Sequence, residues 1–228
     1  MIKIKKGDEM NIENIVNSKV YALFDWIYKL LMLNLIWIGF TIGGFVIFSI
    51  VPATITVYLI LKDTIKGKDV RIFKSFAKIF FSNQYVKSQK LMIILLLFFG
   101  IIGFNYYIFA NSDILSRFSS IALIIIGIIN YIGIMTTIHI FPIFIYFPYL
   151  TVRKSIKYAF LFSFSLPIQT ILMLIILITS LVLGFLLPFY FFLFGISAVV
   201  LLHLYIIRFK YENFNSQGMP LCVENFMN

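Results

Sequence analysis

Residues 21–61 read YALFDWIYKLLMLNLIWIGFTIGGFVIFSIVPATITVYLIL, an almost uninterrupted apolar stretch. As one helix it would be about 60 Å long, roughly twice the 30 Å hydrocarbon core of a bilayer. The chain must therefore turn inside it, and Gly43 and Gly44 are the natural place, with the second arm kinked at Pro52. Two alternatives follow: a pair of full membrane spans, or one span followed by a re-entrant segment.

The remainder of the chain has a similar character, with 61% hydrophobic and 12% charged residues overall. Soluble domains have roughly 45 to 50% apolar and about 25% charged residues, so a water-soluble fold could not bury this much apolar surface. We predict an all-α, polytopic membrane helical bundle of six transmembrane helices, or five if the second is re-entrant. The predicted spans are approximately 22–42, 45–62, 91–110, 120–148, 166–185 and 188–207.

The basic residues predict the orientation, because Lys and Arg are concentrated in cytoplasmic loops. With six spans, nearly all of them fall on one side and only Arg117 falls on the other. We therefore expect a multi-pass protein of the cell membrane with both termini in the cytoplasm. The predicted parts are a cytoplasmic segment 1–19, a membrane domain 20–210 and a cytoplasmic tail 211–228. The residues on the cytoplasmic side are Lys3, Lys5, Lys6, Lys19, those in 62–90 and 151–157, Arg208 and Lys210.

The net charge of +10 raises the question of nucleic-acid binding. Because the cations lie beside apolar segments, membrane lipid and a cytoplasmic protein are the expected partners, and no nucleic acid is expected. The oligomeric state stays open.

Two cytoplasmic stretches, near 70–88 and 151–165, alternate apolar and basic residues with helical spacing. Such amphipathic helices lie at the membrane interface. We expect them to dock a protein partner or lipid through Phe73, Lys74, Phe76, Lys78, Phe80, Arg153, Lys154 and Lys157.

Few polar side chains fall inside the predicted spans. Asp25 and Lys29 are spaced i, i+4 on one helix face, where they can neutralise each other near the cytoplasmic end. A charge within lipid is also a functional-site hypothesis. Asn34 is expected to hydrogen-bond a neighbouring helix, and contact with a solute is the alternative.

His139 lies in a span that also contains Thr136, Thr137 and Pro142. The first interpretation is a bend packed by neighbouring helices. The alternative is a proton or solute pathway, which would require a second polar partner, and His203 is the other histidine of the chain. Two histidines on different helices are a weak metal signal.

The motifs of common enzymes are missing from the sequence: GxSxG, HExxH and the P-loop do not occur. The single cysteine, Cys222, excludes an internal disulfide and a thiol cluster. We expect no catalytic activity, no cofactor and no bound metal.

Four stretches resemble the YesL-like family of bacterial membrane proteins, a domain of unknown function. They are LNLIWIGFTIGG at 33–44, VPATITVYLILKDTIKGKD at 51–69, FKSFAKIFFSNQYVKS at 73–88 and VRKSIKYAFLFSFSLPIQTIL at 152–172. Gln84, Tyr85 and Val86 depart from the family pattern, and the tail after Tyr211 has no counterpart.

The resemblance implies a companion of carbohydrate-importing ABC transporters in Gram-positive bacteria, so an accessory subunit contacting permease or ATPase subunits is the leading hypothesis. A small-solute transporter in its own right and a lipid-binding structural or sensory protein are the alternatives.

Overall fold

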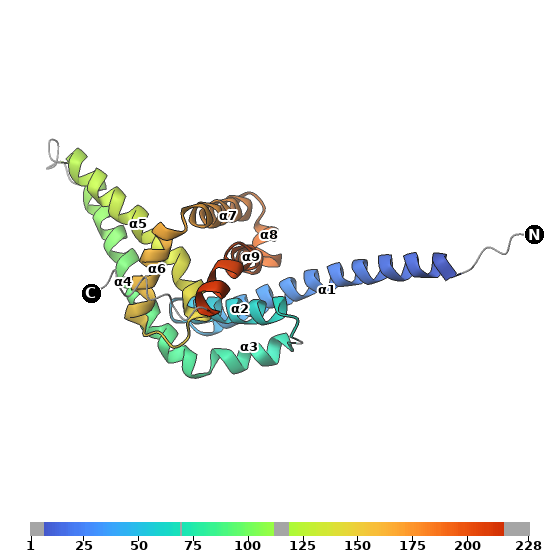
Figure 1. Cartoon of the computed structure of the whole chain (residues 1–228). Coiled ribbons are helices and arrows are strands. Elements are labelled where there is room, and N and C mark those ends of the chain that lie inside the picture. Colours follow the sequence, from blue (N-terminus) through green and yellow to red (C-terminus); the bar gives the residue numbers. More distant parts are fainter. Residues whose placement is uncertain (1–6, 69, 112–118, 217–228) are drawn as a thin grey trace, which may run out of the picture.

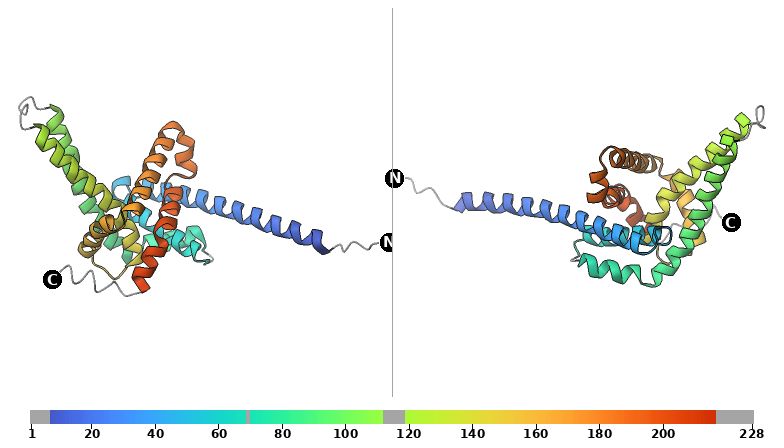
Figure 2. Two further views of the ribbon diagram at one scale, coloured as in Figure 1. Left: turned by 45° about the horizontal axis from the view of Figure 1, so that its top comes forward. Right: turned by 180° about the vertical axis from the view of Figure 1, so that it is seen from behind.

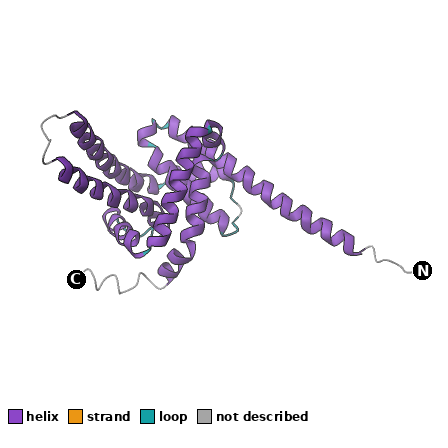
Figure 3. Ribbon diagram, turned by 90° about the horizontal axis from the view of Figure 1, so that it is seen from above, coloured by secondary structure: helices purple, strands orange, loops and turns teal. Residues whose placement is uncertain are grey.

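The computed structural model describes residues 7–68, 70–111 and 119–216, and within these ranges all regular structure is helical (Figures 1 and 3). The helices are α1 (Gly7–Gly43), α2 (Ile50–Ile65), α3 (Ile72–Phe80), α4 (Asn83–Asn111), α5 (Ser119–Tyr146), α6 (Val152–Ser165), α7 (Pro167–Leu186), α8 (Pro188–Leu193) and α9 (Gly195–Ser216), with a short 3-10 turn η1 (Val46–Phe48). Lys3, Lys5, Lys6, Arg117 and Cys222, on which parts of the predicted topology rest, lie outside the described residues.

Four of the described helices are long and apolar enough to cross a membrane. The candidate spans are Lys19–Gly43 in α1, Tyr85–Ile108 in α4, Ile124–Tyr146 in α5 and Pro167–Leu186 in α7. They coincide with the first, third, fourth and fifth predicted spans. The protein is therefore a multi-pass, all-helical membrane protein, whereas the predicted count of six spans is not confirmed.

The second predicted span, 45–62, takes a different form. Helix α2 has only 16 residues, which corresponds to about 24 Å and falls short of the hydrocarbon core. Every residue from Val51 to Tyr58 is buried within the protein. A helix that is apolar on all sides and surrounded by protein is a core helix. The hydropathy of this segment thus reflects its central position in the bundle.

The sixth predicted span, 188–207, is broken at Phe194 into α8 and α9. Pro188 is the first residue of α8, and its lack of an amide proton breaks no hydrogen bond, because the first amides of a helix have no partner within that helix. Helix α9 then continues beyond residue 207 as far as Ser216 and carries Arg208, Lys210 and Glu212 in its second half.

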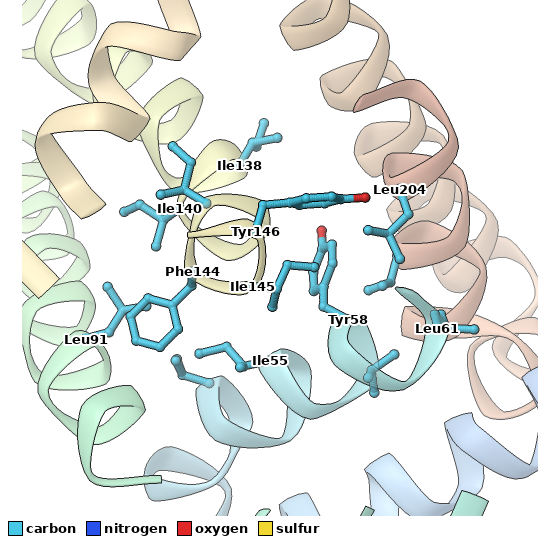
Figure 4. Packing of buried hydrophobic residues seen from close by; sticks show 14 of the residues in the cluster. Ile55, Tyr58, Leu61, Leu91, Ile138, Ile140, Phe144, Ile145, Tyr146 and Leu204 are labelled. Atoms are coloured by element: carbon cyan, nitrogen blue, oxygen red, sulfur yellow. The ribbon is translucent and has the colours of Figure 1, made fainter. Parts of the chain in front are cut away.

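Helix α2 lies at the centre and packs against α1, α3, α4, α5 and α9 (Figure 1). Figure 4 shows Ile55 and Tyr58 of α2 converging with Leu91 of α4, Phe144 of α5 and Leu204 of α9. Helices α5 and α6 pack closely together, as do α7 and α9. The N-terminal half of α1 and the α4–α5 hairpin extend from opposite sides of this body (Figures 1 and 2).

The predicted turn at Gly43 and Gly44 lies where α1 ends. Phe45 follows in the left-handed region with φ 57°, and Ser49 Oγ donates a hydrogen bond to the carbonyl of Gly44. A Cβ atom on Gly44 would overlap Ser49, whereas one on Gly43 would meet no atom within 4 Å. The tight turn therefore requires glycine at position 44.

Candidate functional site: buried polar network and basic surfaces

Asn34 on α1 is fully buried and makes four hydrogen bonds. Its Nδ2 donates to the carbonyls of Phe191 at 2.9 Å and Phe192 at 2.8 Å, near the end of α8. Its Oδ1 accepts from the backbone amides of Ile196 at 3.1 Å and Ser197 at 3.4 Å, in the first turn of α9. Groups at helix ends lack partners within their own helix. One amide side chain therefore satisfies both ends of the α8–α9 break, and its two donors and its acceptor oxygen are occupied by the protein.

His139 on α5 is also fully buried, with a partner at each ring nitrogen. Nδ1 lies 2.7 Å from the hydroxyl of Tyr211 on α9, and Nε2 lies 2.8 Å from the hydroxyl of Thr170 on α7. The hydroxyl of Thr170 donates its proton to the carbonyl of Leu166 at 2.8 Å, so it accepts the proton of His139 Nε2. Nδ1 then carries no proton and accepts from the hydroxyl of Tyr211.

His203 on α9 has an equivalent arrangement. Its Nε2 lies 3.0 Å from the carbonyl of Met173 on α7, and its Nδ1 lies 3.0 Å from the hydroxyl of Tyr58 on α2. Because a carbonyl can only accept, Nε2 carries the proton and Tyr58 donates to Nδ1. The two histidines thus join α7 to α2, α5 and α9. In the part of the chain that the structure describes, no three metal-ligating side chains come together.

The two threonines beside His139 in the α5 span bond within their own helix. Thr136 donates to the carbonyl of Ile132 and Thr137 to that of Gly133, each at 2.8 Å. Pro142 lies inside α5, which continues through it to Tyr146. These hydroxyls therefore supply no free donor to a pathway along the helix.

Asp25 and Lys29 form the expected pair on α1, with Nζ 2.6 Å from Oδ2. Both side chains are partly exposed. Each charge is neutralised by its neighbour one turn away.

Two lysines close the C-terminal end of α5, a role that the sequence pattern did not indicate. Lys62 donates to the carbonyl of Ile145 at 2.8 Å, and Lys87 donates to the carbonyl of Pro148 at 2.8 Å. Each ammonium also lies over an aromatic ring of α5, Lys62 at 4.3 Å from that of Tyr146 and Lys87 at 4.5 Å from that of Phe144. Cations are favourable at a helix C-terminus, so these residues fix the ends of α2, α4 and α5 relative to one another.

The predicted docking residues of α3 divide into two groups. Phe76 and Phe80 are 0% and 5% exposed, with ring centroids 4.8 Å and 5.1 Å from that of Phe40 on α1. They hold α3 against the body and are not accessible to a partner. Phe73, Lys74 and Lys78 are exposed.

On α6, Arg153, Lys154 and Lys157 are exposed, while Tyr158 and Ala159 face inward. Helix α6 packs mainly on α5, whereas α3 packs on α1, α2 and α4. The accessible residues thus form two surfaces, which we call the α3 surface (Phe73, Lys74, Lys78) and the α6 surface (Arg153, Lys154, Lys157).

Comparison with known proteins shows similarity to one family over part of the chain. Residues 30–106, which contain Asn34, α2, α3 and most of α4, match the family model described as "Protein of unknown function, DUF624". The uncharacterized protein YesL of Bacillus subtilis (strain 168) is 27% identical over 150 residues, which cover 65% of this chain and 68% of YesL. These matches show that part of the chain is similar to YesL and to this family.

Two further uncharacterized proteins of Bacillus subtilis (strain 168) extend the YesL-like relationship. YesV is 29% identical over 162 residues, covering 70% of this chain and 76% of YesV. YteU is 26% identical over 158 residues, covering 69% of each chain. No solved structure matches the chain.

Proposed function

We propose that this YesL-like protein is a non-catalytic accessory subunit of a carbohydrate ABC importer. In this role it associates with permease or ATPase subunits in the cell membrane, with both termini in the cytoplasm, and supports assembly or activity of the importer. The observation that supports this non-transporting role is that nearly all buried polar side-chain atoms have hydrogen-bond partners within the protein. Among the described residues, only Thr41 Oγ1 and Arg208 Nε are buried side-chain nitrogen or oxygen atoms without a hydrogen-bond partner.

A sugar-conducting protein would need the opposite arrangement. A hydroxyl-rich solute exchanges its water for hydrogen bonds to the protein, and an unpaired polar group costs about 1–3 kcal/mol. Asn34, His139 and His203 are the strongest polar candidates inside the helices, and the protein occupies each of them. This favours a role for these three residues in joining helices over a role in binding a sugar along a transport pathway.

The α3 and α6 surfaces are the proposed contact sites. Their five cations are exposed, and within the described residues neither α3 nor the first turn of α6 carries an acidic residue. Such a surface complements an acidic face of another subunit and contributes mainly to specificity and association rate. Anionic headgroups would provide about 1 kcal/mol per nearby cation, so lipid can assist the same docking.

Affinity purification of the tagged full chain from native membranes tests the proposal. Wild type should recover importer subunits, and K74E/K78E or R153E/K154E/K157E should recover at least tenfold less. Lys210→Glu, at an exposed cation outside both surfaces, is the control and should behave as wild type. Absence of any importer subunit with wild type, together with unchanged sugar uptake after deletion of the protein, would contradict the proposal.

A further inference from the structure

Two apolar cavities lie side by side between α2 and the helices around it. The first has a volume of about 450 Å³ and is bounded by α2, α4, α5, α7 and α9. The second has a volume of about 570 Å³ and is bounded by α1, α2, α4, α5, α8 and α9. Their shared wall is formed by Thr54, Phe99, Thr137, Phe141 and Ile196.

Both cavities reach the lipid-facing surface of candidate membrane spans. Ile178 and Leu181 line the first cavity and are exposed on the apolar helix α7. Leu96 lines the second and is exposed on α4. In a membrane these surfaces face hydrocarbon, so the molecules that can enter are lipid chains.

The polar atoms in the cavity walls are already engaged. Thr54 donates to the carbonyl of Ile50 and accepts from the indole of Trp37. Thr137 donates to the carbonyl of Gly133, and Tyr58 and His203 bond to each other. A water molecule in a buried site needs two to four polar partners, so these walls favour an apolar occupant.

The volumes match hydrocarbon chains. An apolar cavity of about 150 Å³ accommodates benzene, so about 450 Å³ has room for roughly three times as many carbons, or about 18. That is the size of one long acyl chain. Two such spaces that share a wall fit the two chains of a single glycerolipid.

We propose that this pair of cavities holds the two acyl chains of one membrane glycerolipid. Lipid tails outside the protein are as apolar as the cavity walls, so close packing against the walls retains the lipid. The site is independent of the α3 and α6 surfaces and of the proposed importer partner.

Native mass spectrometry of the full chain after a fixed detergent wash tests the site. Wild type should retain one diacyl lipid per chain. Leu181→Trp narrows the first cavity at a side chain that is 64% exposed, and it should lower lipid occupancy at least fivefold. Val182→Trp, at the neighbouring 50% exposed position that lines neither cavity, should retain the lipid.

A second matched pair of variants tests whether the two acyl chains belong to one lipid molecule. Leu96→Trp alters the second cavity, and Leu97→Trp lies outside both. If one lipid spans both cavities, the mass spectrum of Leu96→Trp should lack the same bound lipid, identified by its mass, as the spectrum of Leu181→Trp. Ile178→Trp provides a replacement for Leu181→Trp if that variant fails to fold.

Three outcomes would overturn the proposal. The first is that wild type binds no lipid. The second is that Leu181→Trp and Val182→Trp retain equal amounts of lipid. The third is that wild type binds two separate lipids, and that Leu181→Trp and Leu96→Trp each lose a different one.

Discussion

The side chain of Asn34 on α1 and the backbone of Ile196 on α9 are joined by a 3.1 Å hydrogen bond across 162 residues of sequence. Together with the bonds to Phe191 and Phe192, this contact holds the end of α8 and the start of α9 in fixed positions. The break in the predicted sixth span is thus stabilised by a residue in the first span.

Replacing Asn34 with Leu should destabilise the protein by at least about 2 kcal/mol. The substitution leaves two carbonyls and two amides, which are only partly buried apart from the amide of Ser197, without their side-chain partner, and an unsatisfied buried group costs about 1–3 kcal/mol. Thermal unfolding in detergent measures the effect, with Leu35→Ala on the exposed side of the same helix as control. Equal unfolding midpoints for the two variants would contradict the assigned role.

Gly44→Ala should be destabilising, whereas Gly43→Ala should change stability by less than about 0.5 kcal/mol. The new methyl group at position 44 would overlap Ser49, and relieving such a clash costs about 1–3 kcal/mol. The methyl group at position 43 would enter open space. Chemical denaturation of both variants in the same detergent provides the comparison, and a tolerated alanine at position 44 would show that the turn differs from the one described.

Tyr58→Phe and Tyr211→Phe should each lower stability by about 1 kcal/mol, because each leaves the Nδ1 of a buried histidine without its donor. Tyr106→Phe, at an exposed tyrosine on α4, serves as the control and should be neutral. Unfolding midpoints report the difference. If all three variants match wild type, the histidines are not held by these hydroxyls.

Phe76→Ala should destabilise by about 3–5 kcal/mol because it opens a cavity between α3 and α1. Phe73→Ala should have a much smaller effect on stability, since the Phe73 side chain is 64% exposed and its ring lies farther from Phe40, at 6.4 Å between centroids. Hydrogen exchange across α3 distinguishes these outcomes. Fast exchange throughout wild-type α3 would indicate that the helix is not docked on Phe40.

The sequence predicted the membrane class and the turn at Gly43 and Gly44, because composition and local residue types determine these features. The length and burial of α2 could not be predicted in the same way. A core helix surrounded by apolar neighbours has the same hydropathy as a helix surrounded by lipid.

Polar contacts between residues close in sequence could also be predicted, whereas those between residues far apart could not. The Asp25–Lys29 pair follows from i, i+4 spacing alone. The partners of His139 and His203 are Tyr211 and Tyr58, which lie 72 and 145 residues away, so no local pattern joins them. The docking interpretation of Phe76 and Phe80 likewise changed because Phe40 comes from a distant helix.

Sugar uptake into proteoliposomes separates an accessory subunit from a transporter, with three preparations compared: this chain alone, the purified importer alone, and both together. We expect no sugar flux through the chain alone and a higher rate of ATP-driven uptake when the chain accompanies the importer. Sugar flux through the chain alone, or an importer rate unchanged by its addition, would show that the protein is not an accessory subunit.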